Sequence, residues 1–362
     1  MERNILRSII LLSEKAANIA RTIRKEDHLL SLLTREKKDD EKNQRFFQDF
    51  KTLADVLVQE VVKHELGTEF PELVGHIYGE ESNEFSCLDG ETIELKVCIS
   101  EEKTAQQLLR IVGDEKVANL LACLVHSKPE FPDDLEIPTD VTCLPLEEIG
   151  IWIDPIDSTA EYINANEEIS SVNGICLSGL PCVTVLIGAF LRGKSSGNPV
   201  LGVLNQPFHK YADGRWKGRV MWGIAYRETI LSSVTPLSGG EKLVVLSRFE
   251  KEEVKSRLKK AGYTLLEAAG AGYKLMLVAT GAVCAYVLSK PCTFYWDTCS
   301  VDTILRAHTG GLVNYHLAVT EKKICPLLYC EGVGVDQCAN KGGFIAYNNS
   351  DVLHDIIGVL AD

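Results

Sequence analysis

Apolar residues recur at helical spacing in the first part of the chain. In residues 1–23 they stand three or four positions apart, at Ile5, Ile9, Leu12, Ala16, Ile19 and Ile23. Phe50–Lys63 has the same period, and Ala105–His126 contains further helical stretches. We therefore predict helices in all three segments. The highly charged Arg24–Arg45 predicts a solvated helix or loop.

Shorter apolar runs predict strands through the rest of the chain. Cys182–Leu191 and Pro199–Asn205 are joined by the polar Gly193–Asn198 and predict a hairpin. The other predicted strands are His76–Gly79, Glu91–Ser100, Gly218–Tyr226, Lys242–Ser247 and Val283–Leu288. Helices are predicted at Lys251–Lys260, at Thr298–His308 and after the turn Ala268–Lys274. His126–Leu144, rich in proline and acid, predicts an excursion over the surface.

The order of these elements is not a regular βαβ alternation. It favours a layered α/β or α+β architecture over a doubly wound sheet. No internal repeat is present. The stretch Pro207–Gly214 predicts a domain divide. We expect an N-terminal α+β domain over residues 1–208, with most metal ligands, and a C-terminal α/β domain over residues 209–362.

Composition narrows the function classes. The 362 residues include 38 basic and 51 acidic side chains, a formal net charge of −13. Nucleic-acid binding needs basic surface, so we expect no nucleic-acid partner. No apolar stretch approaches the ~20 residues that span a membrane, and the charged N-terminus does not resemble a secretory signal. The 12 cysteines form no CxxC pair, which favours free thiols in the reducing cytoplasm. No obligate protein partner is indicated.

The candidate chemistry begins where an apolar strand ends in acid. The run Ile149–Ile153 is followed by Asp154, Pro155, Ile156, Asp157, Ser158 and Thr159. Proline and aspartate favour turns, so a plain turn is the simplest interpretation. However, strand ends are where α/β proteins place sites, and hydroxyls at a helix start can cradle a phosphate. The two carboxylates would also repel each other unless a cation lay between them.

Other acids have a similar placing. Glu80 and Glu81 follow a predicted strand, and Asp297 lies between an aromatic run and a helix. Asp55 falls on the apolar helix Phe50–Lys63. The simpler interpretations are a helix cap for Asp297 and solvated surface charges for the others. Carboxylate oxygens select Mg²⁺ or Mn²⁺ over zinc, and two such ions about 4 Å apart would hold a phosphate and activate a water.

The glycine-rich turn Ala268–Lys274 is a second candidate for anion binding. It lacks a strand-linked GxGxxG, so a dinucleotide site is weakly supported. It would offer backbone N–H groups to an anion, with Lys274 as a point charge. A plain helix start explains the same turn equally well.

Together these motifs resemble the lithium-sensitive, Mg²⁺-dependent phosphatase superfamily that includes inositol monophosphatase, fructose-1,6-bisphosphatase and 3′,5′-bisphosphate nucleotidase. The resemblance runs nearly end to end, through SEKAANIAR, DFKTLADVLVQEV, GEESNEF, WIDPIDST, AAGAGYK, WDTCS and NKGGFIAY. It implies a layered αβαβα sandwich with the site between domains. It also implies removal of the 1-phosphate from inositol 1,4-bisphosphate and inositol 1,3,4-trisphosphate. Mg²⁺ would be the cofactor, at two or three ions per site, and Li⁺ an inhibitor.

The resemblance also implies a role for each candidate residue. One Mg²⁺ would be held by Glu80, Asp154 and the carbonyl of Ile156, and another by Asp154, Asp157 and Asp297, with Glu81 as an outer ligand. Thr159, hydrogen-bonded to Asp55, would orient and deprotonate the attacking water. The phosphate would meet Asp157, Ser158 and Thr159. The inositol and its other phosphates would contact Lys251, Gly270, Ala271 and Lys274.

Ser158, where many relatives carry glycine, favours one member of the superfamily. Two departures stand beside the resemblance, and the first is Ser300, where alanine is usual. Phe249 replaces a hydroxyl that would contact substrate, which leaves the preference among inositol phosphates open; the neighbouring Arg248 could replace that contact. Activity as a 3′,5′-bisphosphate nucleotidase is therefore an alternative. A non-catalytic inositol-phosphate-binding protein is the alternative from another class, and a structural divalent-metal protein would leave the Ser158-Thr159 cradle unexplained.

Overall fold

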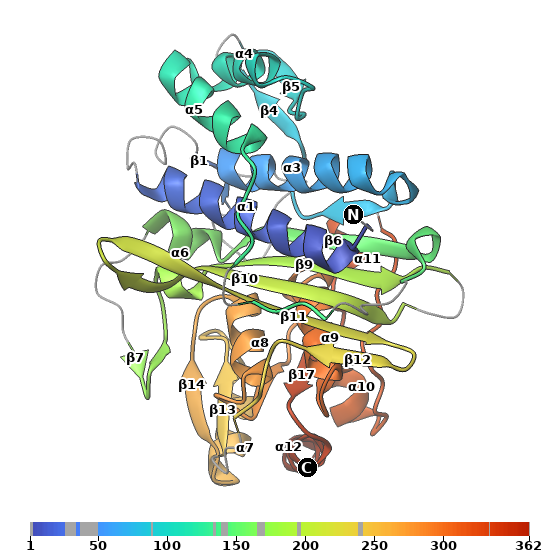
Figure 1. Cartoon of the computed structure of the whole chain (residues 1–362). Helices are drawn as coiled ribbons and strands as arrows, with labels where there is room; N and C mark the ends of the chain where they lie inside the picture. Colours follow the sequence, from blue (N-terminus) through green and yellow to red (C-terminus); the bar gives the residue numbers. More distant parts are fainter. Residues whose placement is uncertain are drawn as a thin grey trace.

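Two stacked β-sheets, with helices between and outside them, form the frame of the molecule (Figure 1). The computed structural model describes residues 3–25, 34–36, 50–87, 90–132, 135–138, 144–164, 171–193, 197–237, 242–332 and 334–361. The layers alternate as α, β, α, β, α, which confirms the predicted sandwich. The predicted loop or helix Arg24–Arg45 lies mostly outside the described residues.

The first sheet has six strands in the order β12-β11-β10-β9-β6-β3 in the described part of the chain. They are β3 (Ile77–Gly79), β6 (Ile149–Asp157), β9 (Thr184–Leu191), β10 (Pro199–Ala212), β11 (Arg215–Tyr226) and β12 (Thr229–Ser232). Only β3 and β6 pair in parallel among these neighbours. The antiparallel pairing of β9 with β10 confirms the predicted hairpin.

The predicted domain divide falls inside the β10–β11 hairpin. Pro207 lies where the register of that hairpin shifts, between Gln206 and Lys210. The sheet then continues to Ser232, and the second sheet begins at Leu243. The division of the chain into two domains stays a prediction.

Helices α1 (Ile5–Lys25) and α3 (Leu53–Glu69) cover the outer face of this sheet, with α4 (Glu101–Val112) and α5 (Glu115–His126) stacked beyond them (Figure 1). Along β6 the side chains alternate between two cores. Ile151 and Ile153 pack in the core below α1 and α3, and Trp152 packs on the opposite face. Because both faces of the strand are covered, its sequence is a continuous apolar run.

The second sheet has five strands in the order β14-β13-β15-β17-β16 among the described residues. They are β13 (Leu243–Leu246), β14 (Thr264–Glu267), β15 (Ala285–Leu288), β16 (Gly311–Asn314) and β17 (Phe344–Tyr347). Helices α8 (Ala271–Ala279) and α9 (Tyr295–Arg306) lie between the sheets, and α7 (Glu252–Lys260), α10 (Tyr315–Thr320) and α12 (Ser350–Ala361) cover the outer face.

The remaining elements are short. They are β1 (Thr34–Glu36), β2 (Phe50–Thr52), β4 (Glu84–Ser86), β5 (Thr92–Glu94), β7 (Ser171–Val172), β8 (Ile175–Cys176), α6 (Thr159–Asn164), α11 (Val335–Cys338) and the 3₁₀ turns Pro71–Leu73, Leu146–Glu148 and Leu180–Cys182. Of the predicted strand Glu91–Ser100 only Thr92–Glu94 forms a strand, and Ser100 caps α4. The described cysteines are free, as predicted. No described helix has the length and apolar character needed to cross a membrane.

A row of glycines seats α9 on the first sheet. Gly188, Gly202 and Gly223 are paired neighbours on β9, β10 and β11. A Cβ atom at Gly202 would lie 1.8 Å from the carbonyl oxygen of Ser300. A Cβ atom at Gly188 would lie 2.5 Å from the main-chain nitrogen of Ser300. Residues Thr298–Leu305 of α9 are all buried. The helix can therefore approach the strands only because this row has no side chains.

We predict that Gly202→Ala destabilises the protein by about 2 kcal/mol or more, because the new methyl group meets main-chain atoms that cannot move aside. Urea unfolding followed by circular dichroism measures this. Gly358→Ala is the matched control. Gly358 lies in α12, and a Cβ atom there would have no neighbour within 4 Å, so alanine should stabilise the protein by about 0.5–1 kcal/mol. Equal unfolding midpoints for the two variants would contradict this account of α9.

Candidate active site

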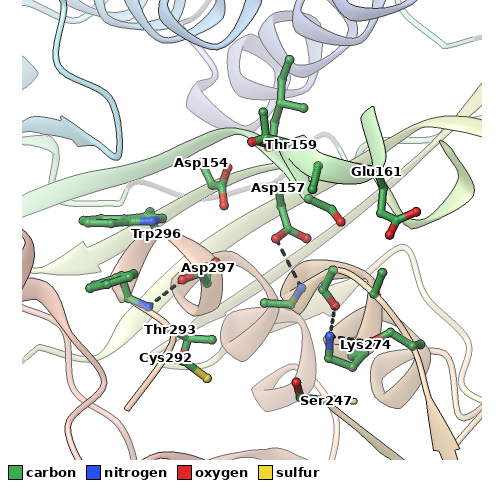
Figure 2. Close-up of a pocket in the computed structure, with 18 of the residues that line it drawn as sticks. Asp154, Asp157, Thr159, Glu161, Ser247, Lys274, Cys292, Thr293, Trp296 and Asp297 are labelled. Carbon is green, nitrogen blue, oxygen red and sulfur yellow. Dashed lines mark hydrogen bonds between the residues drawn. The ribbon is translucent and has the colours of Figure 1, made fainter. Parts of the chain in front are cut away.

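A β-bulge brings Asp154 and Asp157 to the same side of β6. Three residues apart on a regular strand, they would face opposite sides of the sheet. The pairing with β9 shifts by one residue between them, since Asp154 pairs with Leu186 but Asp157 with Thr184. The extra residue turns both carboxylates toward one space, as Figure 2 shows.

Asp297 reaches the same space from the first turn of α9 (Figure 2). Asp154, Asp157 and Asp297 each offer a carboxylate oxygen within 4.8 Å of the others. Asp154 and Asp157 are buried and Asp297 is partly buried. The strand-end motif and the WDTCS segment, far apart in the sequence, thus form one acidic cluster.

The cluster lies in a pocket of about 460 Å³ between the two halves of the chain. Most of the predicted site residues line it: Glu80, Asp154, Ile156, Asp157, Ser158, Thr159, Gly270, Ala271, Lys274 and Asp297. Asp55 and Glu81 are buried outside this lining. The surface interpretation of these two acids is therefore wrong. Lys251 is exposed and outside the lining, whereas Arg248 and Phe249 belong to it.

Three of the acids bind the N-termini of helices. Asp157 accepts the N–H groups of Ala271 at 3.3 Å and Gly272 at 2.9 Å, at the start of α8. Asp297 accepts the N–H of Phe294 at 2.6 Å, at the start of α9. Asp55 accepts the N–H of Thr52 at 2.7 Å, at the start of α3. The positive ends of α8 and α9 favour the charged forms of Asp157 and Asp297.

Burial nevertheless dominates the electrostatics of the cluster. It raises the pKa of Asp154 well above its ordinary value, and the charges of Glu80, Asp157, Asp297 and Asp55 raise it further. Burial also raises the pKa of Asp297 and of Asp157, and Lys274 opposes the rise in both. Without a cation, the folded protein holds these carboxylates at a cost in free energy.

The residues present fit a divalent cation. The Oδ1 atom of Asp154 is buried and has no hydrogen-bond partner among the described residues. Such an acceptor is costly unless something fills its place. Asp157 and Asp297 add carboxylate oxygens close by, the donor type that hard divalent cations prefer. The cluster therefore has the charge and the donor type of a divalent-cation site.

Two of the predicted site residues make contacts that are not part of their predicted roles. The Lys274 ammonium group is buried and donates to the carbonyls of Ala268 at 3.0 Å and Gly270 at 2.6 Å. It therefore fixes the turn before α8, in addition to carrying charge. The Thr159 hydroxyl donates to the carbonyl of Ile156 at 3.1 Å. Its predicted hydrogen bond to Asp55 stays a prediction.

Ser158 explains how the chain turns from β6 into α6. Its φ of 73° lies in the left-handed region, which costs a serine roughly 1 kcal/mol more than a glycine. A glycine at this position would adopt the same backbone without that cost. The strained turn places Ser158 and Thr159 on the pocket wall directly after the acids.

Sequence reasoning missed Thr184, whose hydroxyl donates to Asp157 at 3.1 Å. It stands inside an apolar strand and has no motif around it, so only the pairing of β9 with β6 reveals it. The segment Gly188–Ser195, GAFLRGKS, matches the phosphate-loop spacing GxxxxGK[ST]. Gly188 lies within β9, however, and the chain returns as the antiparallel β10. A phosphate loop must open a helix, so this match carries no site.

Comparison with known proteins agrees with the fold. The model of the inositol monophosphatase family matches residues 7–335. The chain belongs to the inositol monophosphatase family. The resemblance inferred from the motifs is therefore confirmed.

Individual members of the inositol monophosphatase family are similar to different degrees. Inositol polyphosphate 1-phosphatase of Homo sapiens is 42% identical and the match covers 99% of this chain and 97% of that protein. 3′(2′),5′-bisphosphate nucleotidase 1 of Mus musculus is 27% identical, over 74% of this chain and 72% of that protein. The structure of the suhB protein of Bartonella henselae superposes with a TM-score of 0.55 at 13% identity, over 98% of both chains, which supports the fold.

We predict that Mg²⁺ raises the melting temperature more at pH 8 than at pH 5.5. The pKa values of Asp154, Asp157 and Asp297 are raised in the folded state. The metal-free protein therefore loses stability as pH rises from the ordinary range of these groups through their folded pKa values. Mg²⁺ competes with the protons and stabilises the deprotonated form, by about 3 kcal/mol at 100-fold excess over its Kd. Differential scanning calorimetry at both pH values measures the shift.

Asp154→Asn should remove the Mg²⁺ shift and raise the melting temperature of the metal-free protein. Asp302→Asn is the control. Asp302, on α9, is buried like Asp154, but its carboxylate is paired with Arg306 at 3.0 Å. That variant should lose stability and keep the shift. An Mg²⁺ shift that is independent of pH, or that survives Asp154→Asn, would contradict the assignment.

Proposed function

We propose that this chain is an Mg²⁺-dependent phosphomonoesterase that removes the 1-phosphate from inositol 1,4-bisphosphate and inositol 1,3,4-trisphosphate. The observation that carries the proposal is the cluster of Asp154, Asp157 and Asp297 in a pocket shared with Ser158 and Thr159. The 42% identity to human inositol polyphosphate 1-phosphatase supports the substrate class. Sensitivity to Li⁺ and a cytoplasmic location belong to the proposal through this similarity.

The metal would be held by oxygen donors of the pocket. Glu80, Asp154 and the carbonyl of Ile156, which all line it, would form one set, and the clustered Asp154, Asp157 and Asp297 would form another. Glu81 is a candidate outer ligand, so two or three ions are expected. When bound, Mg²⁺ makes a coordinated water more acidic and offsets phosphate charge. Asp157 keeps its orientation throughout, because α8 and Thr184 hold both of its oxygens.

The protein's own residues would then orient the phosphate and the water. The Ser158 hydroxyl and the main-chain N–H of Thr159, at the start of α6, donate to the phosphate oxygens. The Thr159 hydroxyl, after rotating away from Ile156, accepts the proton of the attacking water while its own proton passes toward Asp55. The water oxygen bonds to phosphorus, and the bond from phosphorus to the inositol oxygen breaks. The released inositol oxygen takes up a proton from solvent water, and Asp55 returns its proton to solvent.

The substrate side of the pocket favours a second phosphate. Arg248 and Lys274 are the described cations among the lining residues, and Lys274 already donates to two carbonyls. The guanidinium of Arg248 makes no such contact in the described structure. We therefore assign Arg248 ahead of Lys251 as the contact for a distant phosphate. Gly270 and Ala271 would meet the inositol ring from the start of α8.

One observation keeps the nucleotidase alternative in view. Phe249 lines the pocket and is 70% exposed, and an exposed aromatic ring can stack on a base. The non-catalytic alternative is less favoured. Asp55, Glu80, Asp154, Asp157, Thr159 and Asp297 are all present, whereas a protein that only binds has no need of the pair Asp55–Thr159.

We expect Mg²⁺-dependent phosphate release from inositol 1,4-bisphosphate, and little from 3′-phosphoadenosine 5′-phosphate. The measurement is phosphate release from each substrate, with and without Mg²⁺. Release from the nucleotide alone would mean that the role assigned to the acidic cluster is correct and that the assigned substrate is wrong. Absence of release from both, with Mg²⁺ bound, would favour the binding-only alternative.

Asp55→Asn should retain Mg²⁺ and substrate binding while kcat falls by about 100-fold or more, because the proton from Thr159 loses its acceptor. Asp55 also caps α3 through Thr52, so a capping control is needed. Asp114→Asn alters the acid that caps α5, where it accepts the N–H groups of Lys116 and Val117. Because asparagine caps a helix about as well as aspartate, that variant should change stability little and leave kcat intact. Full turnover in Asp55→Asn would eliminate the proposed proton path.

A further inference from the structure

Gln59 is a buried polar residue that the proposed mechanism does not use. It lies on α3 one turn after Asp55, so both side chains project from the same face of the helix. It is fully buried in a helix whose other inward residues are mostly apolar. A buried amide is costly unless all its groups are bonded.

The amide of Gln59 holds the main chain of Glu81 from both sides. Its Oε1 accepts the N–H of Glu81 at 2.9 Å, and its Nε2 donates to the carbonyl of Glu81 at 2.5 Å. This two-bond contact reproduces the pairing of a neighbouring strand. Gly79 makes it possible, because a Cβ there would lie 1.9 Å from Oε1 of Gln59.

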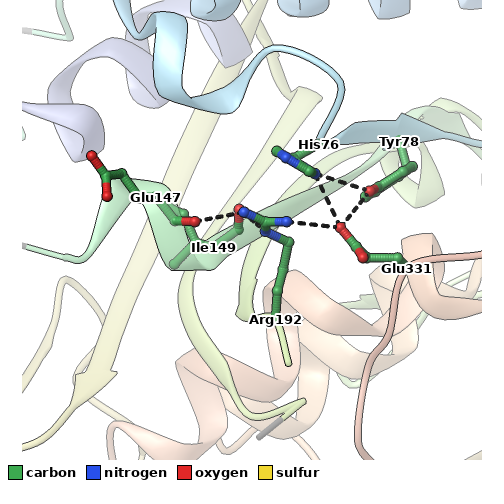
Figure 3. Close-up of polar contacts among 6 residues, drawn as sticks. All are labelled: His76, Tyr78, Glu147, Ile149, Arg192 and Glu331. Atoms are coloured by element: carbon green, nitrogen blue, oxygen red, sulfur yellow. Dashed lines mark hydrogen bonds and ion pairs between the residues drawn. The ribbon is translucent and has the colours of Figure 1, made fainter. Parts of the chain in front are cut away.

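The chain that leads to Glu81 is also fixed. The N–H of Glu80 donates to the carbonyl of Ile153 at 3.2 Å, next to Asp154. His76, directly before β3, and Tyr78, within it, both contact the carboxylate of Glu331, at 3.0 and 2.8 Å, and Arg192 completes this cluster (Figure 3). The strand leading to Glu80 is thus anchored at its start, and Gln59 anchors it just past its end.

We propose that Gln59 is a positioning residue for the metal site. By holding Glu81, it sets where the carboxylates of Glu80 and Glu81 stand relative to Asp154, Asp157 and Asp297. Glu80 lines the pocket, and Gln59 itself lies outside that lining. It would therefore act on metal affinity without touching metal or substrate. The inference rests on the metal-binding part of the proposed function.

Gln59→Met keeps the length of the side chain and removes both hydrogen bonds. We expect Mg²⁺ affinity to fall about tenfold or more, the usual effect of losing a contact behind a metal ligand. Isothermal titration calorimetry of the full chain with MgCl₂ measures affinity without turnover. Phosphate release should then require more Mg²⁺ for half-maximal rate, while kcat at saturating Mg²⁺ stays near that of the unaltered protein.

The chain offers a matched control in Gln107. On α4 its Oε1 accepts the N–H of Lys96 at 3.2 Å and its Nε2 donates to the carbonyl of Glu94 at 2.9 Å. Gln107→Met removes the same kind of contact away from the pocket. It should leave Mg²⁺ affinity unchanged.

Gln59→Glu is the second variant, and it guards against a loss of folding in Gln59→Met. It keeps an acceptor for the Glu81 N–H but has no donor for the carbonyl, so a partial loss of affinity is expected. A purely structural role would lower the melting temperature and leave the Mg²⁺ affinity of the folded protein within about twofold of its original value. That result would overturn the inference. Absence of Mg²⁺ binding in the unaltered protein would instead overturn the metal site itself.

Discussion

The close contact between α9 and the first sheet is the constraint on which the site depends. Asp297 lies in the first turn of that helix, so its position follows from how deeply the helix sits on β9, β10 and β11. Gly188, Gly202 and Gly223 have no side chains that would keep the helix away from these strands. The same contact buries Thr298–Leu305 between two sheets. The geometry of the acidic cluster is thus set by packing that contains no catalytic group.

The second constraint is charge. A chain with a net charge of −13 gathers several of its acids in one buried pocket, and burial raises the pKa of each of the clustered three. The N-termini of α3, α8 and α9 each bind one acid, and Lys274 adds a buried positive charge. These contacts orient the carboxylates but leave Oδ1 of Asp154 without a partner among the described residues. A bound cation that competes with protons for these carboxylates would supply the remaining compensation.

The pocket also joins the two halves of the chain. Asp157 belongs to β6 of the first sheet, yet its carboxylate is bound by the N–H groups that open α8. Lys274, on α8, fixes the turn that presents those groups. Any movement between the halves would therefore alter the acidic cluster directly. The pocket walls that include Arg248 and Phe249 come from the second half.

The sequence by itself determined the helices of the first layer, the β9–β10 hairpin and the identity of the clustered acids. These signals are local: a helical period, a polar turn between apolar runs, and carboxylates directly after a strand. Tertiary structure decided the rest. The bulge that turns Asp154 and Asp157 to one side appears only in the pairing with β9. Three further features depend on the folded chain. They are the burial of Asp55, the hydrogen bonds of Lys274 to main-chain carbonyls and those of Gln59 to the main chain of Glu81. Sequence decides which groups a segment carries, but the partner that each buried polar group finds is set by which elements pack against it.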